Sequence, residues 1–183
     1  YESKYLKEHR LKFPKTFWDD FPFNLSVVDE IERVTVTSRQ YYHFIRKRAE
    51  SETAAYRPNM YEKREEEHGW LLALYKKWGI QDEATQEMLA RRYIERFIGC
   101  VENLTNPSCT LSVRQKKQEI HKMLQNPRVR RCLHKARPHS IYMKCMLIPI
   151  RLRSVQLLYW ECKFISFVKT RDTKLFSKLK AGR

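Results

Sequence analysis

The sequence predicts an α+β fold that is mostly helical, and two observations predict it. Two short segments, residues 33–37 and 40–45, are rich in β-branched or aromatic residues in the alternating pattern typical of strands. From residue 60 onward, apolar residues instead recur at helical spacing between glycine and proline breaks. We therefore expect a small α/β piece over residues 1–56 and a helical region over residues 57–183.

The expected α/β piece begins with helices and ends with two strands. A short helix is expected over residues 2–10, and an extended segment follows because the residue before Pro14 avoids helical backbone angles. A second helix is expected over residues 21–31, where Phe21, Leu25 and Val28 share one face. Two strands are too few to form a stable sheet alone. We therefore expect them to pair with strands outside this sequence, and the chain to be a piece of a longer protein.

The helical region is expected to contain six helices separated by identifiable breaks. Gly79 ends the first helix, Asp82 starts the second, and Ser112 caps the third. Pro149 is expected to interrupt the fifth helix, because proline lacks a backbone donor. The expected ranges are residues 61–78, 82–104, 112–124, 127–136, 141–148 and 154–168.

Positive charge is concentrated in the last third of the chain. The net charge is +16, and residues 111–183 hold 19 Lys and Arg against three Asp and Glu. The remaining residues are balanced, so the surplus belongs to this basic tail. A field of this sign attracts nucleic acid, anionic lipid or diphosphate-bearing substrates.

The five cysteines favour a reducing, cytoplasmic setting. They are odd in number and widely spaced, and no CxxC motif occurs. We expect them to act as small apolar residues. No run of 18 apolar residues occurs, so no membrane-spanning helix is expected.

Two adjacent acids, Asp19 and Asp20, stand between bulky aromatic residues at the start of an expected helix. Removing a carboxylate from water is costly, so such a pair calls for a partner or a task. One interpretation is that Asp20 caps the helix, because Asp is a preferred N-cap residue. The other is that Asp20 is a catalytic carboxylate.

The order of segments around this pair resembles the second half of the catalytic domain of family 2 glycosyltransferases, which are inverting enzymes of the GT-A type found in bacterial capsule and exopolysaccharide synthesis. Residues 5–13 resemble the approach, and Trp18-Asp19-Asp20-Phe21 resembles the acidic pair, with Asp19 in place of the usual Glu. The resemblance continues through residues 23–25, 41–48 and 51–53. Residues 144–150 and 164–169 resemble the basic helical tails of such enzymes.

This resemblance implies a fold and a set of roles. Residues 1–56 would be the C-terminal remnant of a GT-A α/β domain, with two strands and one helix. Asp20 would be the general base beside Asp19, and the substrate diphosphate would be bound by His43, Arg46, Arg48 and Ser51. The sequence pattern alone also allows residues 46–48 to be a solvated basic turn, and it allows the histidine to be a packed strand residue.

The family's nucleotide-binding half and its Asp-x-Asp metal motif do not occur in this sequence. A divalent cation, Mg²⁺ or Mn²⁺, is expected for the full enzyme, with ligands outside this chain, and the chain alone is expected to be inactive. We expect no metal site within it. Glu65 and His68 have a metal-ligand spacing without a second copy, and Cys132 and His134 lack a completing pair.

The resemblance also implies partners: a nucleotide-sugar donor and a glycan or polyprenyl-diphosphate-linked acceptor. Residues 141–183 combine a wide apolar stripe with basic flanks, which is typical of a helix lying on an anionic membrane surface. The expected location is peripheral, at the cytoplasmic face of the cell membrane, and nucleic acid is not among the expected partners. The alternatives are a core helix with basic flanks, or a non-enzymatic basic module that binds nucleic acid or an anionic membrane.

Overall fold

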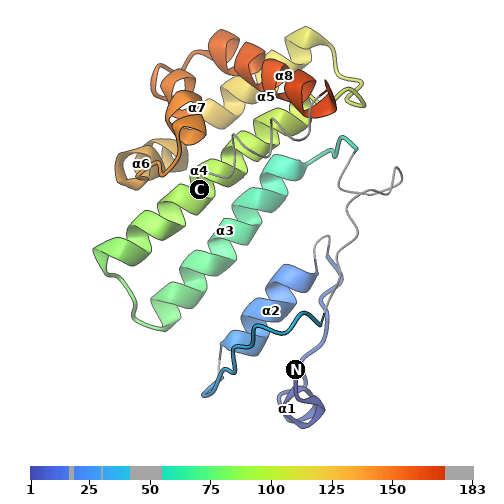
Figure 1. The fold of residues 1–183 in the computed structure, drawn as a ribbon, viewed down its shortest axis with the longest axis vertical. Coiled ribbons are helices and arrows are strands. Elements are labelled where there is room, and N and C mark those ends of the chain that lie inside the picture. Colours follow the sequence, from blue (N-terminus) through green and yellow to red (C-terminus); the bar gives the residue numbers. More distant parts are fainter. Residues whose placement is uncertain (17–18, 30, 42–54, 172–183) are drawn as a thin grey trace. The chain divides into compact units, whose positions relative to one another are not determined.

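The structure is a computed structural model that describes residues 1–16, 19–29, 31–41 and 55–171. Within these ranges the chain forms eight helices (Figure 1). They are α1 (Ser3–Glu8), α2 (Asp20–Val28), α3 (Met60–Lys77), α4 (Glu83–Leu104), α5 (Val113–Gln125), α6 (Pro127–Lys135), α7 (Ile141–Arg151) and α8 (Val155–Arg171). The sequence predicted each of these helices, although several boundaries differ by one to three residues.

The predicted α+β class is wrong, because the structure is 67% helix and contains no strand among the described residues. Residues 33–37 have no regular secondary structure, and neither do residues 40 and 41; residues 42–45 lie outside the described part of the chain. Val34 and Val36 are 71% and 89% exposed, so their side chains gain no burial. Alternation favours a strand only where a neighbouring strand or a covering layer exists. The GT-A remnant of two strands and one helix is therefore corrected to helices with irregular connections.

The chain divides into two compact units, each described here by itself. The N-terminal unit comprises Tyr1–Ala54 and Glu65–Ile80, and the C-terminal unit comprises Ala55–Arg64 and Gln81–Arg183. The small apolar core of the N-terminal unit comes from α2 and α3. Its buried side chains are those of Phe23, Val27, Leu71 and Leu74.

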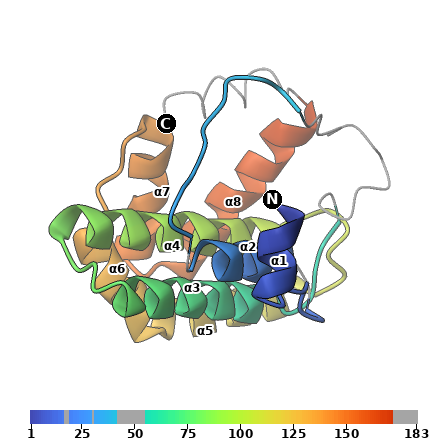
Figure 2. The same cartoon turned by 90° about the horizontal axis from the view of Figure 1, so that it is seen from below.

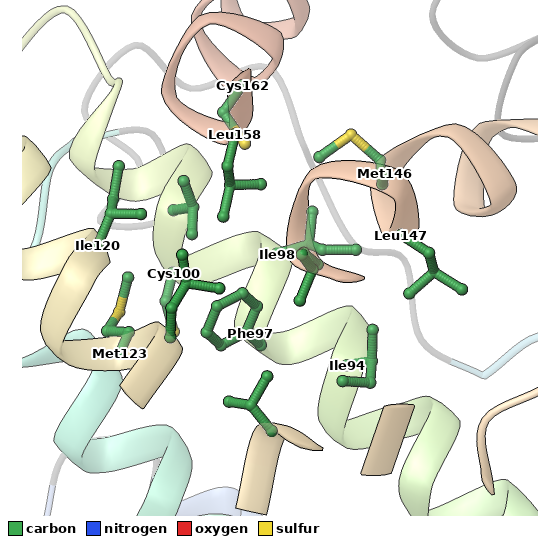
Figure 3. Close-up of a cluster of buried hydrophobic side chains, with 14 of the residues drawn as sticks. Ile94, Phe97, Ile98, Cys100, Ile120, Met123, Met146, Leu147, Leu158 and Cys162 are labelled. Atoms are coloured by element: carbon green, nitrogen blue, oxygen red, sulfur yellow. The ribbon is translucent and has the colours of Figure 1, made fainter. Parts of the chain in front are cut away.

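The C-terminal unit is built around α4. This helix contacts α6 and α8, while α5 contacts α6 and α8, and α7 contacts α8. Figure 2 shows α7 and α8 on one side of α4. Apolar side chains from all five of these helices pack together in the core, with Phe97 of α4 at the centre of the view in Figure 3 and Ile120, Leu147 and Leu158 around it. Burial of this apolar surface is the main term that holds the unit together.

Side-chain caps fix the starts of the helices in the C-terminal unit. Asp82 accepts a hydrogen bond from the backbone nitrogen of Thr85, and Ser112 forms a reciprocal capping box with Gln115. Both starts were predicted from the sequence. The hydrogen bonds to Asp82 hold the pKa of its carboxyl below the ordinary value, because they favour the ionised form.

Asn126 ends α5 and begins α6. Its side-chain oxygen accepts a hydrogen bond from the backbone nitrogen of Arg128 at 2.9 Å, and Pro127 occupies the first turn of α6. Its side-chain nitrogen donates to the hydroxyl of Tyr61 at 2.7 Å. One amide therefore holds the corner between two helices and the start of α3.

Pro149 does not interrupt α7, contrary to the sequence prediction. The helix continues through this residue and ends at Arg151. A proline removes one intrahelical hydrogen bond, and here that loss falls in the last turn, where the helix is about to end. The ring is buried in the unit.

None of the described helices is long and apolar enough to cross a membrane. Four of the five cysteines, Cys100, Cys109, Cys132 and Cys162, are buried, Cys145 is exposed, and none of the five forms a disulfide. The buried thiols fill space in the core, as predicted.

Candidate functional sites

The acidic pair lies at the N-terminal end of α2. Asp19 occupies the N-cap position and Asp20 is the first helical residue. Both residues are exposed. Neither carboxylate forms a hydrogen bond or ion pair with a residue that the structure describes. The two acids are therefore presented to solvent at the positive end of a helix dipole.

The interpretation that Asp20 caps α2 is wrong. Asp20 lies inside the helix, and the residue at the cap position, Asp19, makes no side-chain capping bond because its backbone is already helical (φ −59°, ψ −22°). Of the flanking aromatic residues, Phe21 is half-buried, and Trp18 lies outside the described residues. Both acids are exposed, so no described residue buries the pair.

Residues far away in the sequence hold α2 in place. The rings of Phe13 and Phe23 stack with centroids 3.9 Å apart, and the hydroxyl of Tyr5 donates to the carbonyl oxygen of Val27 at 3.0 Å. The hydroxyl of Tyr1 bonds the side-chain oxygen of Asn24. These contacts come from the residues before α2, so the segment that approaches the acidic pair also fixes its helix.

A groove of about 320 Å³ lies between α2 and α3 within the N-terminal unit, and neither Asp19 nor Asp20 lines it. It begins at Pro22, two residues after Asp20, and reaches Asp29. Trp70 and Lys77 of α3 line the facing wall. The indole of Trp70 offers apolar contact to a ligand, while the ammonium of Lys77 and the carboxylate of Asp29 offer polar contacts.

The other predicted site residues, His43, Arg46, Arg48 and Ser51, lie outside the described part of the chain. The structure therefore brings together only Asp19 and Asp20 of the predicted set. Among the described residues, no group of three or more His, Cys, Asp and Glu could hold a metal ion. The divalent cation that the resemblance implies was expected to have its ligands outside this chain.

The last helix, α8, presents two different apolar faces. One face is buried in the C-terminal unit through Leu158, Tyr159 and Cys162. The other is exposed, and its four large apolar residues recur at intervals of three and four: Leu157 (52% exposed), Trp160 (52%), Phe164 (66%) and Phe167 (52%). We call these four residues the exposed stripe. The ammonium of Lys163 lies 5.0 Å from the ring centroid of Trp160, so a cation accompanies the stripe.

Glu161 lies on α8, between its two apolar faces. It is half-buried, and its Oε2 atom is buried without a hydrogen-bond partner among the described residues. Burial raises the pKa of the Glu161 carboxyl above its ordinary value, because a charged carboxylate is poorly solvated there.

Sequence reasoning missed a third feature, a hollow on the C-terminal unit that is lined by four arginines. Arg130 and Arg131 come from α6, while Arg151 and Arg153 come from the end of α7 and the residues after it. The sequence contains the doublet at 130–131 as a possible signal. Nothing in the sequence, however, indicates that residues twenty positions apart line one hollow.

No protein-family model, curated protein or solved structure matches this chain.

Proposed function

We propose that this chain is part of a glycosyltransferase that moves a sugar, with inversion, from a nucleotide-sugar donor to a glycan or lipid-linked acceptor. Asp20 is the proposed general base. The observation that carries the proposal is the exposed carboxylate of Asp20 at the start of α2, which pairs with no residue that the structure describes. The residues around it in the sequence resemble those around the acidic pair of family 2 glycosyltransferases. The proposal does not require the two strands that were expected beside it.

In this reaction the Asp20 carboxylate needs only to lie near the acceptor hydroxyl and to be negatively charged. The acceptor hydroxyl gives its proton to the Asp20 carboxylate as its oxygen attacks the anomeric carbon of the donor. The bond from that carbon to the diphosphate breaks on the opposite face, which inverts the configuration. The Asp20 carboxylate lies at the N-terminus of α2 and is exposed, so an acceptor hydroxyl can approach it.

The proposed site also includes residues that bind the diphosphate and a residue that acts on Asp20. Proposed diphosphate-binding residues are His43, Arg46, Arg48 and Ser51, because arginine gives bidentate contacts to phosphate oxygens. Asp19 is proposed to shape the field around Asp20. The Mg²⁺ or Mn²⁺ ion of the full enzyme is proposed to be held by ligands outside this chain.

The test is a transfer assay with the full-length protein and a panel of nucleotide sugars. Asp20→Asn keeps the side-chain size and removes the base, so transfer should be lost while the far-ultraviolet circular dichroism spectrum is unchanged. Glu32→Gln is the matched control, because Glu32 is another exposed carboxylate of the N-terminal unit. Turnover retained by Asp20→Asn would remove Asp20 from the mechanism.

A second candidate function, binding to an anionic membrane surface, is favoured by the exposed stripe of α8. Four large apolar side chains on one helix face, inside a chain segment with a large excess of Lys and Arg, match the composition of an interfacial helix. This function is compatible with the first, because a polyprenyl-linked acceptor lies in the membrane. The proposed location is peripheral, at the cytoplasmic face of the cell membrane.

A further inference from the structure

The hollow on the C-terminal unit has an apolar floor and a basic rim. Its volume is about 720 Å³, within the range of small-molecule sites. Leu124, Val129 and Ile150 form the buried floor, with 6%, 2% and 1% of their surfaces exposed. The exposed rim consists of Arg130, Arg131, Arg151 and Arg153 together with Gln125 and His134.

The four arginines of the rim are positively charged, and no described acidic residue beside them in the hollow neutralises that charge. Among the described residues, no Asp or Glu lines the hollow. None of the four guanidinium groups forms an ion pair or hydrogen bond with a residue that the structure describes. By contrast, Arg91 pairs with Glu87 at 3.1 Å and Arg137 pairs with Glu83 at 2.6 Å elsewhere in the same unit. Four like charges around one concavity repel one another, and an anion bound there would relieve that repulsion.

The backbone places the last of these arginines in an unusual conformation. Arg153 has φ of 51°, in the left-handed region that a residue with a side chain seldom adopts. This residue lies in the tight connection between α7 and α8, where its backbone nitrogen bonds the carbonyl oxygen of Ile150 at 3.1 Å. The turn therefore holds Arg153 at the rim, beside the end of α7 that supplies Arg151.

We propose that this hollow is a binding site for a phosphate or diphosphate ester that carries an apolar group. The phosphate oxygens contact the guanidinium groups, which are planar, permanently charged and suited to bidentate contacts. The apolar group lies on the floor formed by α5, α6 and α7. This site goes beyond the proposed transfer function and does not depend on it, because Asp20 belongs to the other unit.

The test compares two probes that share a diphosphate, inorganic diphosphate and geranyl diphosphate, by isothermal titration calorimetry on the chain. Both should bind, and geranyl diphosphate should bind more tightly, because only it covers the floor. Replacing Arg130 and Arg151 together by glutamine should weaken binding of both probes by about a hundredfold, since each charge-assisted contact is worth about tenfold or more in affinity. Added salt should weaken the binding as well.

The matched control removes two positive charges outside the hollow. Arg114 and Lys144 are exposed residues of the same unit that do not line it, so the pair Arg114→Gln and Lys144→Gln gives the same change in net charge. The control should bind within about twofold of the unchanged chain. Equal losses in the two pairs would show a diffuse charge effect and overturn the site, as would the absence of saturable binding by both probes.

A second arm identifies the source of the phosphate. Phosphatidylcholine vesicles with and without phosphatidic acid are sedimented with the chain and with both variant pairs. Binding that needs phosphatidic acid and is lost only in the Arg130/Arg151 pair assigns the site to a lipid headgroup. Binding of the soluble probes without such a vesicle effect assigns it to a free phosphate ester. Intact thermal unfolding of each variant, followed by circular dichroism, shows that the loss is not one of folding.

Discussion

The ammonium of Lys77 lies 2.7 Å from the carboxylate of Asp29, which connects the C-terminal end of α3 to the residue after α2. The indole nitrogen of Trp78 donates to the backbone oxygen of Asp29 at 3.2 Å. Lys77, the last residue of α3, and Trp78, which follows it, thus hold the C-terminal end of α2, the helix that presents the acidic pair.

The first prediction concerns this ion pair. The two side chains are 55% and 27% exposed, so solvent screens the attraction. A double-mutant cycle with Asp29→Asn and Lys77→Met should give a coupling of about 0.5 kcal/mol. Urea unfolding followed by tryptophan fluorescence measures it. The coupling should decrease in high salt, and a coupling that salt leaves unchanged would contradict a screened ion pair.

The second prediction concerns Asp20 as the proposed general base. Asp20→Asn should lower kcat by about 10²- to 10⁴-fold, the usual contribution of a general base, with little change in KM. Asp19→Asn should lower kcat much less, because Asp19 acts only through the field around its neighbour. Initial-rate assays separate the two constants. Equal effects of the two substitutions would show that the pair acts by charge alone and not as base and neighbour.

The third prediction concerns the exposed stripe of α8. Replacing Trp160 and Phe164 by serine should lower binding to anionic vesicles by about tenfold or more, because each buried aromatic side chain contributes more than about 1 kcal/mol. Vesicle co-sedimentation measures the change. The same substitutions at Val36 and Tyr41, which are 89% and 75% exposed, are the matched control and should have no effect.

The lipid dependence of this binding decides between membrane and nucleic acid. Neutral vesicles should bind more weakly than anionic ones, because the basic residues of the same segment add electrostatic attraction. A salt-dependent shift with single-stranded RNA, without binding to vesicles, would contradict the membrane interpretation. Exposed aromatic rings beside cations can also stack on bases.

The fourth prediction concerns pH and Glu161. The raised pKa of this carboxyl means that folding favours its neutral form. Its contribution to stability is complete below the pKa of the unfolded chain and is lost as pH rises through the higher folded-state pKa. Glu161→Gln should therefore raise Tm near neutral pH, and the difference should vanish toward about pH 4. Thermal unfolding between these two conditions measures it, and a difference independent of pH would contradict the assignment to ionisation.

The helices could be predicted because their signals are local. Asp82 and Ser112 each cap a helix through a bond to a residue three positions along, and such a bond can be read from sequence spacing. Pro149 shows the limit of this approach. Its effect depends on how near the helix end lies, and that is set by the packing of α7 in the core.

The two strands were wrongly predicted because a strand forms only where a neighbouring strand pairs with it, and a short sequence pattern does not show whether such a neighbour exists. Val34 and Val36 have suitable side chains and spacing, yet both are exposed and unsupported in the described chain. For the same reason the sequence could not tell which side of α8 is buried. Leu158 and Trp160 are both apolar, and only contacts with other helices place one in the core and the other on the surface.

The candidate sites differ in how far the sequence could reveal them. Asp19 and Asp20 are adjacent in the sequence, so they are neighbours whatever the fold. Arg130 and Arg151 line one hollow only because α6 and the end of α7 converge on it. Composition predicts that a basic surface exists, but it does not say which side chains surround a concavity.

The corner held by Asn126 has a practical consequence. Its amide bonds the hydroxyl of Tyr61, and the ring of Tyr61 meets that of Phe97 edge-on with centroids 6.4 Å apart. Asn126 also lines the arginine hollow. The side chain of Tyr61 therefore contacts both a residue that lines the arginine hollow and a residue at the centre of the core, and it can serve as an intrinsic spectroscopic reporter. Its assigned ring resonances would record events at the corner without an added label.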